Sequence, residues 1–196
     1  MKFSFLKSFL LITLLVVALF IIGSSCNSPD PTPTPQLTCD DSEPILESIF
    51  TALASPASMD LQQHEYKFTS AVAGEICFLG YQSLMQTTPF AIDNTTISYT
   101  LEIVGGPSVT QVFSSTSVEY VALPTPFAIN AGQEYTIRRT GGDGLNSSTG
   151  YISNVPSFPV TNGNITFTSS NFIDVPPGGG PLANFGIPKI YFRFLE

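Results

Sequence analysis

A strict alternation of apolar and polar residues runs from Thr96 to Ile103. Its apolar members are Ile97, Tyr99, Leu101 and Ile103, and the residues between them are Thr, Ser and Glu. Side chains of a β-strand point alternately to its two faces, so a period of two places one face on a core and the other in water. A helix, with a period of 3.6, does not fit this pattern. The segment therefore predicts a half-buried β-strand.

Similar segments recur along the chain at the spacing expected of a β-sandwich, separated by Gly and Pro. They are Glu65–Thr69, Glu75–Tyr81, Val109–Ser114, Val118–Leu123, Glu134–Thr140, Gly163–Ser169 and Lys189–Leu195. In the last, Ile190, Phe192 and Phe194 share one parity, which predicts a half-buried C-terminal strand. The fold class predicted is all-β, a single antiparallel β-sandwich of jelly-roll-like form.

The segment Ile45–Leu53 has two interpretations. Ile45, Ile49 and Leu53 are four residues apart, which fits a short amphipathic helix. The segment also fits a first edge strand, and the β-rich context favours the strand slightly.

Composition narrows the class of protein. Only 11% of the residues are charged, and 7 Lys and Arg stand against 15 Asp and Glu, for a formal net charge of −8. Nucleic acid is excluded as an expected partner, because binding to phosphate backbones needs a basic face. The residues from Leu37 to Glu196 are enough for one domain with a sizeable core.

The first 25 residues contain the three parts of a secretory signal peptide. Lys2 and Lys7 make the start cationic, Phe9–Ile22 is almost wholly apolar, and Gly23–Ser25 are small. Together with Cys26, the segment resembles a bacterial lipoprotein signal. The resemblance implies an exported, membrane-anchored protein whose Cys26 is lipidated, with palmitate as an acyl group. Ordinary signal cleavage and an uncleaved anchor stay open as alternatives, although the run is shorter than the ~20 residues of a spanning helix.

The residues from 26 to 36 are expected to form a tether between the lipid and the domain at 37–196. Ser28–Pro35 contains four prolines, which favour an extended, semi-rigid spacer. Under the rule of enteric bacteria, Asn27 after the cysteine favours the outer membrane. Whether the domain faces the periplasm or the cell surface stays open.

Cys39 and Cys77 are the two remaining cysteines. Export makes a disulfide between them one reading. The other is a buried Cys77 that packs as a small apolar residue, with a free Cys39 near the tether.

Three pieces of the chain resemble a secreted β-sandwich domain of unknown function that recurs in surface-attached bacterial proteins. They are Tyr66–Phe68 with Ala73–Ile76, Pro126–Ile137, and Gly163–Thr166. The middle piece carries the pattern Ala-Gly-x-x-Tyr, in which we expect Gly132 to form a tight turn and Tyr135 to fill the core. The resemblance covers roughly Glu47 to Phe194 and implies a fold, with no reaction attached to it.

No catalytic residue, metal ligand or cofactor is predicted. The single histidine, His64, precedes a strand, and we expect it to be solvated or in a turn rather than to serve as a base. No His and Cys spacing indicates zinc. Glycoside hydrolysis needs two suitably placed carboxylates, and the sequence pairs none of Asp93, Glu102, Glu119, Asp143 and Asp174.

A binding site is easier to place than a catalytic one. The candidates gather around the Gly-rich loop after the strand Glu134–Thr140, and they are Arg139, Asp143, Asn146, Tyr151 and Phe158. Arg139 shares the parity of Tyr135 and is expected to point inward. Tyr151 and Phe158 are predicted to form an apolar platform, while Asp143 and Asn146 offer oxygen ligands for Ca²⁺. Each also has a simpler reading: a structural ion pair for Arg139, ordinary packing for the rings, and a solvated turn for the loop.

The sequence therefore predicts a lipid-anchored envelope protein that binds glycan or another extracellular polymer without catalysis. The alternative is a structural or adhesion component that contacts other envelope proteins. A concave, aromatic-lined site near Tyr151 and Arg139 would favour the first, and an exposed apolar patch or free strand edge would favour the second.

Overall fold

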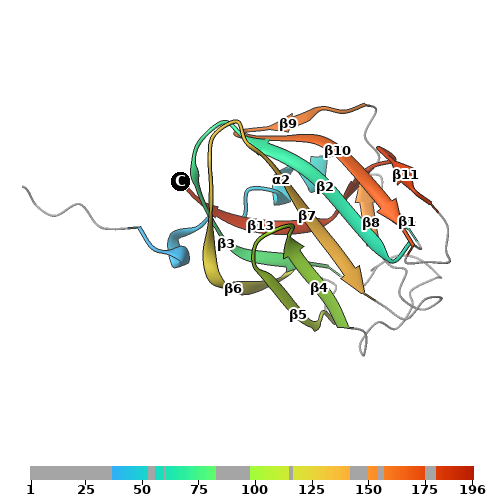
Figure 1. Ribbon diagram of the computed structural model, residues 1–196, viewed down its shortest axis with the longest axis horizontal. Helices are drawn as coiled ribbons and strands as arrows, with labels where there is room; N and C mark the ends of the chain where they lie inside the picture. The colour runs from blue at the N-terminus through green and yellow to red at the C-terminus, as the bar shows by residue number, and fades with distance from the viewer. Residues whose placement is uncertain are drawn as a thin grey trace, which may run out of the picture. The chain divides into compact units, whose positions relative to one another are not determined.

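Two antiparallel sheets packed face to face make up most of the domain (Figure 1). The computed structural model describes residues 37–52, 56–59, 61–82, 98–114, 117–141, 150–153, 157–174 and 180–196. The helices are the 3₁₀ helix η1 (Cys39–Asp41) and α2 (Glu47–Ala52). The strands are β1 (Pro56–Met59), β2 (Gln63–Ser70), β3 (Gly74–Tyr81), β4 (Ser98–Ile103), β5 (Ser108–Val112), β6 (Glu119–Ile129), β7 (Glu134–Gly141), β8 (Gly150–Ser153), β9 (Val160–Asn162), β10 (Ile165–Ile173), β11 (Leu182–Ala183), β12 (Ile187–Pro188) and β13 (Ile190–Leu195).

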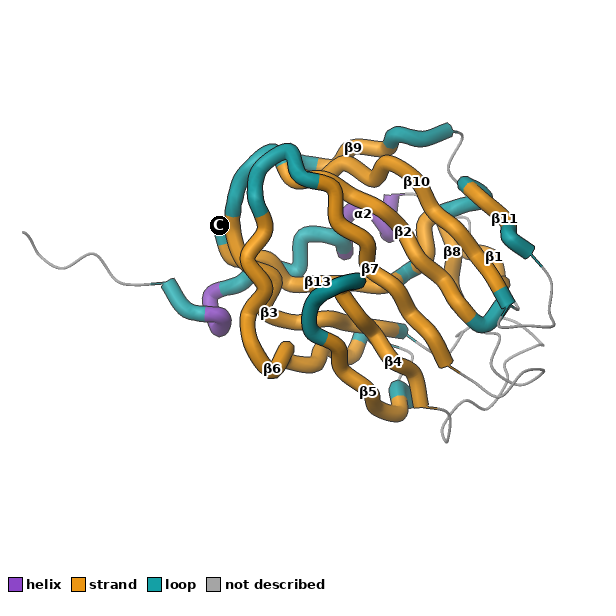
Figure 2. The backbone as a smooth tube through the Cα atoms, viewed as in Figure 1, coloured by secondary structure: helices purple, strands orange, loops and turns teal. Residues whose placement is uncertain are grey.

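The larger sheet has the order β11-β10-β2-β7-β4-β5, with β9 also paired to β10, and the sheet facing it has the order β13-β3-β6 (Figure 2). A small third sheet has the order β1-β8-β12. The chain passes between the two main layers from β2 to β3, from β5 to β6 and from β6 to β7, which gives the jelly-roll-like course. The predicted all-β antiparallel sandwich is confirmed.

Aromatic side chains join the two main layers. The rings of Phe68 on β2 and Phe192 on β13 lie 5.1 Å apart, and the Tyr66 hydroxyl donates a hydrogen bond of 2.8 Å to the carbonyl oxygen of Ile190. Each fully buried ring removes enough apolar surface from water to stabilise the fold by about 1.5–3 kcal/mol. The hydroxyl of Tyr66 keeps a partner inside the core, as a buried polar group must.

The predicted alternation holds in both strands where it was clearest. Tyr99, Leu101 and Ile103 of β4 are buried, while Ser98 on the other face is exposed. β13 buries Ile190, Phe192 and Phe194 as expected. It is more buried than predicted, because Tyr191 on its other face packs against Tyr120 of β6.

The preference for an edge strand in Ile45–Leu53 is wrong. The chain forms the helix α2 from Glu47, and the buried Leu46 and Ile49 cover the core three residues apart. Among the described residues, extended pairing of this part of the chain with β13 is limited to Glu43, whose N–H and carbonyl both bond to Phe194.

The Ala-Gly-x-x-Tyr segment forms the tight turn that its residues predict. Gly132 has a φ of +75°, a conformation that costs a residue with a side chain about 1–2 kcal/mol. Its N–H donates to the Ser70 carbonyl at 2.8 Å. Tyr135 is buried, and its hydroxyl accepts the N–H of Asn130 at 2.8 Å, so the ring fills the core and its oxygen closes the turn.

A disulfide joins Cys39 of η1 to Cys77 of β3. Leu37–Glu196 forms a compact unit of its own, and the disulfide ties the first residues of this unit to the middle strand of the smaller sheet. Among the described residues, neither helix is long and apolar enough to cross a bilayer. Cys26 and the Pro-rich segment lie outside the described residues.

Candidate functional site

Arg139 is fully buried on the inner face of β7. Tyr135 and Ile137 point the same way, whereas Arg138 points outward, so the alternation of the strand sets the direction of each side chain. The expectation that Arg139 points inward is confirmed. Its neighbours across the sheet are His64 on β2 and Leu101 on β4.

Two tyrosine rings frame the Arg139 guanidinium. Its central carbon lies 5.6 Å from the ring centre of Tyr81 on β3 and 5.2 Å from that of Tyr99 on β4. The two rings are 5.1 Å apart. The distances from the guanidinium carbon to the two ring centres both lie within the ~6 Å over which a cation is attracted to an aromatic face. This attraction is stronger when water is excluded.

The hydrogen bonds of Arg139 are incomplete within the described structure. Nη2 donates to the Leu61 carbonyl at 3.3 Å, while Nε and Nη1 have no acceptor. None of the ion pairs formed by the described residues involves Arg139. The simpler reading of Arg139, an ion pair with an acid, therefore finds no support there.

His64 lies beside Arg139, and the expectation that it would be solvated is wrong. It is 1% exposed, and its ring meets Phe172 of β10 edge-on at 5.0 Å. Burial, and then the positive charge of Arg139, lower the pKa of His64 well below its usual value, against the opposing effect of a hydrogen bond with the Leu61 backbone. The imidazole is therefore neutral, and its Nε2 has no partner in the described residues.

Burial also raises the pKa of the Tyr81 hydroxyl, although Arg139 acts in the opposite direction. The cluster is thus one cation among neutral polar and aromatic groups. It lies at the end of the sandwich where β3 and β7 finish and β4 begins, at Tyr81, Gly141 and Ser98. We call Arg139, His64, Tyr81 and Tyr99 the arginine cluster.

Of the other predicted binding residues, only Phe158 has a described side chain. Asp143 and Asn146 lie outside the described residues, and so does the side chain of Tyr151, whose backbone forms part of β8. Phe158 is half-buried and packs against the core. The platform of Tyr151 and Phe158 stays a prediction.

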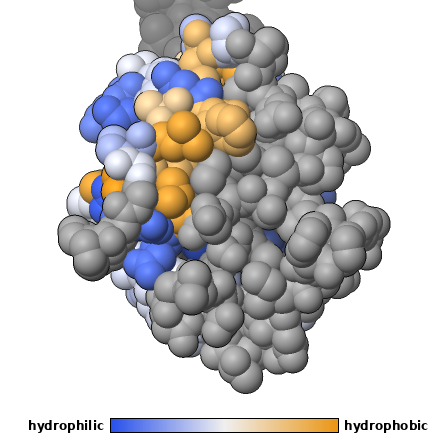
Figure 3. All heavy atoms as spheres, turned by 90° about the vertical axis from the view of Figure 1, so that its right-hand side faces the viewer, coloured by the Kyte–Doolittle hydropathy of each residue, from blue (hydrophilic) through white to orange (hydrophobic). Residues whose placement is uncertain are grey.

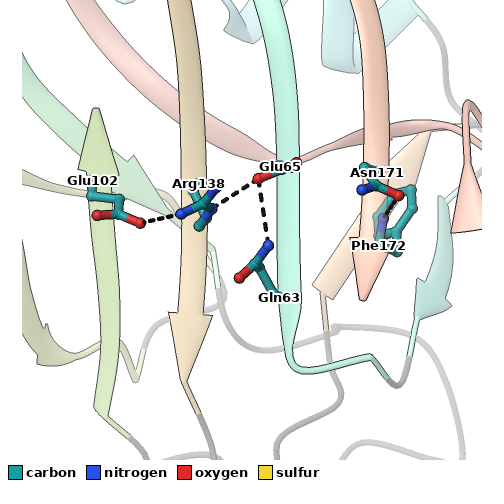
Figure 4. A network of polar contacts seen from close by, with 6 residues as sticks. All are labelled: Gln63, Glu65, Glu102, Arg138, Asn171 and Phe172. Atoms are coloured by element: carbon teal, nitrogen blue, oxygen red, sulfur yellow. Dashed lines mark hydrogen bonds and ion pairs between the residues drawn. The ribbon is translucent and has the colours of Figure 1, made fainter. Parts of the chain in front are cut away.

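The outer face of the larger sheet carries a separate polar network (Figure 4). Arg138 donates from Nε to Glu65 at 2.8 Å and from Nη1 to Glu102 at 3.0 Å. Gln63 donates to the same Glu65 oxygen at 3.4 Å. Because Glu102 is held by this ion pair, it has a structural partner rather than the freedom of a catalytic acid.

The other carboxylates considered for hydrolysis stand on different elements. Glu119 of β6 accepts the Ser114 N–H at 2.8 Å, and Asp174, after β10, accepts the Gln62 N–H at 3.1 Å. Asp93 and Asp143 fall outside the described residues. Nothing in the described part pairs two of these acids for hydrolysis.

Other features of the described surface offer weaker sites. One hollow of about 220 Å³ lies between β2, β10 and β11, and another of about 260 Å³ lies where Leu37 and Glu43 meet the end of β13. Neither includes Arg139 or Phe158. Within the described ranges, the one grouping of potential metal ligands is Cys39, Glu75 and Cys77, and its two sulfurs are joined in the disulfide.

The sequence contained a signal that the His64 side chain is buried. It shares the parity of Tyr66 and Phe68 on β2, and all three face the core. Tyr81 and Tyr99 gave no sign of a site, because a tyrosine on the apolar face of a strand reads as core.

Comparison with known proteins found no match: no family model, curated protein or solved structure matches this chain.

Proposed function

We propose that this chain is an envelope-anchored, non-catalytic binding module for glycan or another extracellular polymer, with the arginine cluster as its binding site. One observation carries the proposal: the buried Arg139 has two nitrogens without an acceptor in the described structure, between two aromatic rings. Buried polar groups normally have partners, and those without one are candidates for ligand contacts. A guanidinium and tyrosines are the groups that commonly fix polar ligands.

The absence of catalysis in this proposal follows from the chemistry of the cluster. A nucleophile needs a base that can accept its proton, and the neighbour of the neutral His64 is a cation rather than a Ser or Cys. Cys77 is held in the disulfide. A site made of a cation and neutral groups can hold a ligand and has no acid and base pair to transform it.

The envelope location is proposed from the N-terminal residues, with lipid on Cys26 as the anchor in the outer membrane. The disulfide between Cys39 and Cys77 supports export, because disulfides persist in oxidising compartments and are rare in the cytosol. Mass spectrometry of the membrane fraction tests the anchor directly. An unmodified Cys26 would overturn it.

A screen of purified full-length protein against polysaccharides tests the binding function. We expect saturable binding that is lost in Arg139→Met and kept in Arg138→Gln. The second variant is a matched control, because it removes the neighbouring arginine from the opposite face of β7. Failure of every polysaccharide to bind would overturn the proposal.

A second candidate, an adhesion or structural component, has an observation of its own. β11 is the outermost strand of the larger sheet, and its end of the domain shows hydrophobic atoms at the surface (Figure 3). There Leu182 is 38% exposed and Phe185, just after the strand, is 48% exposed. Exposed apolar side chains at a free sheet edge suit contact with another protein. If Leu182→Ser with Phe185→Ser abolishes chemical cross-linking to other envelope proteins while Arg139→Met does not, this candidate replaces the first.

A further inference from the structure

The arginine cluster has an unfilled set of hydrogen-bonding positions that is specific enough to define a ligand. Within the arginine cluster, the buried side-chain atoms without a hydrogen-bond partner in the described structure are Nε and Nη1 of Arg139 and Nε2 of His64. Arg139 can only donate hydrogen bonds. A neutral imidazole has one donor and one acceptor, and His64 uses its other nitrogen toward the Leu61 backbone. Nε2 is therefore an acceptor that needs a donor.

The geometry of the guanidinium requires more than one acceptor. Nε–H and the Nη1 hydrogens lie along different edges of the planar group, so a single carboxylate cannot accept from both. A ligand that satisfies the cluster must offer a strong acceptor for one edge and a second oxygen for the other. It must also offer a hydroxyl that donates to His64.

The positive charge of Arg139 requires a strong acceptor that is negatively charged. Arg138, one residue away, pairs with both Glu65 and Glu102 at the surface, whereas the buried Arg139 has no anion among the described residues. An isolated charge is costly to bury, so the missing partner should carry a negative charge. A carboxylate matches the planar fork of a guanidinium.

We propose that the arginine cluster binds a uronate residue of an acidic glycan. Its carboxylate accepts from Nη1 of Arg139, a ring or hydroxyl oxygen accepts from Nε, and a hydroxyl donates to Nε2 of His64. This inference rests on the proposed glycan-binding function and names the class of sugar. Arg139 is fully buried, so binding requires a conformational change, and association is expected to be slow.

His64 provides a direct measurement, because it is the single histidine of the chain. Histidine-labelled full-length protein in detergent gives imidazole NMR signals from this residue alone. We would titrate it with a galacturonate trisaccharide, the matched neutral galactose trisaccharide, and acetate. The expected result is a saturable shift of the His64 signals with the galacturonate trisaccharide, at least tenfold tighter than with either other probe.

Variants place the contact on Arg139. Arg139→Met is expected to weaken binding of the galacturonate trisaccharide at least tenfold, while Arg138→Gln leaves it within twofold. Should Arg139→Met fail to fold, the comparison of the three probes on the native protein still decides the question. Binding of the acidic trisaccharide that leaves the His64 signals unchanged would place it elsewhere and overturn the inference.

The remaining outcomes separate this inference from the proposed function. Equal binding of the neutral and acidic trisaccharides would refute the inference that the ligand is a uronate, while the proposed glycan-binding function would still hold. If acetate binds as tightly as the acidic trisaccharide, the cluster recognises a carboxylate alone, and the inference that it binds a sugar acid is overturned. If no sugar binds here and none binds in the polysaccharide screen, both proposals fail.

An acid of the chain itself is the other source of a carboxylate. Asp60, Asp93 and Asp143 are the acids of the domain at 37–196 that lie outside the described residues, and Asp60 directly precedes Leu61. Asp60→Asn, Asp93→Asn and Asp143→Asn test this source in the absence of any sugar. If any of these substitutions shifts the His64 signals, the carboxylate is internal and the ligand inference is overturned. Unchanged signals in all three variants support an external carboxylate.

Discussion

Breaking the disulfide between Cys39 and Cys77 tests how the start of the domain is held to its sheet. The bridge joins residues 38 apart in the sequence. In the chain-entropy model, a closed loop of that length removes about 13 cal/mol/K of entropy from the unfolded chain, or about 4 kcal/mol at 25 °C. For a domain of this size, 1 kcal/mol changes the Tm by about 2–4 °C. Cys39→Ala should therefore lower the Tm by about 8–16 °C.

The choice of residue separates the disulfide from packing. Cys39 is half-buried in η1, so replacing it breaks the bridge without opening the core, whereas Cys77 is buried in β3. Adding Cys77→Ala should cost about 1 kcal/mol more, because a small buried group is lost. Urea unfolding followed by circular dichroism measures both steps.

Reductant supplies the internal control. It should bring the unfolding midpoint of the native protein to that of Cys39→Ala and leave the variant unchanged. A difference in unfolding free energy below about 1 kcal/mol between native protein and Cys39→Ala, with no response to reductant, would refute the loop-closure reasoning.

Three further substitutions probe the close contacts and the buried histidine. Gly74→Ala would place a Cβ in steric conflict with the Leu195 carbonyl oxygen, so we expect a loss of about 1–3 kcal/mol by urea unfolding, and an unchanged midpoint would contradict the contact. Tyr135→Phe leaves the Asn130 N–H without its 2.8 Å acceptor, so a loss of about 1–2 kcal/mol and faster hydrogen exchange at Asn130 are expected. Because burial lowers the pKa of His64, the unfolded chain takes up its proton first, and stability should fall as the pH drops below 6.5, by at most about 1.4 kcal/mol per pH unit. His64→Gln should flatten this dependence between about pH 6.5 and 5.5; equal slopes in both proteins would show that the folded histidine binds the proton.

The long strands of this fold were predictable from residue order, because each buries one face over many residues. β4 shows this, since alternation alone predicted which of its apolar side chains are buried. In β13 alternation predicted the burial of Ile190, Phe192 and Phe194 but not that of Tyr191. The short strands β1, β8, β9, β11 and β12 were missed. They have two to four residues each, and two to four residues are too few to display a period, so partners distant in sequence decide their pairing.

Helix α2 was one of the two interpretations of its segment, and the strand was slightly preferred to it. The apolar residues of this segment fit both a short helix and a strand, and the β-rich context favoured the strand. A period cannot separate the two in so short a segment. In the structure, the buried Ile49 of the helix and the buried Leu46 just before it cover the core.

Part of the candidate site was predictable and part was not. Parity placed Arg139 inside the sandwich from the sequence. The same parity applied to His64, but a histidine beside a glutamate at a strand start suggested solvent. The tyrosines could not be assigned, because nothing in residue order tells that β3 and β4, in different sheets, bring Tyr81 and Tyr99 to one cation.

Replacing Arg139 tests whether the arginine cluster contributes to the stability of the domain or to ligand binding. Replacing buried ionic groups with apolar residues of similar size is often neutral or stabilising, whereas removing one partner of a buried ion pair costs about 3–5 kcal/mol. Arg139→Met gives up two cation–π contacts, each worth about 2 kcal/mol at a desolvated site, and avoids a burial penalty of several kcal/mol. We therefore expect its unfolding free energy to change by less than about 2 kcal/mol while ligand binding is lost. A loss of about 3–5 kcal/mol would instead show that Arg139 pairs with a carboxylate of the chain and contributes to stability rather than to binding.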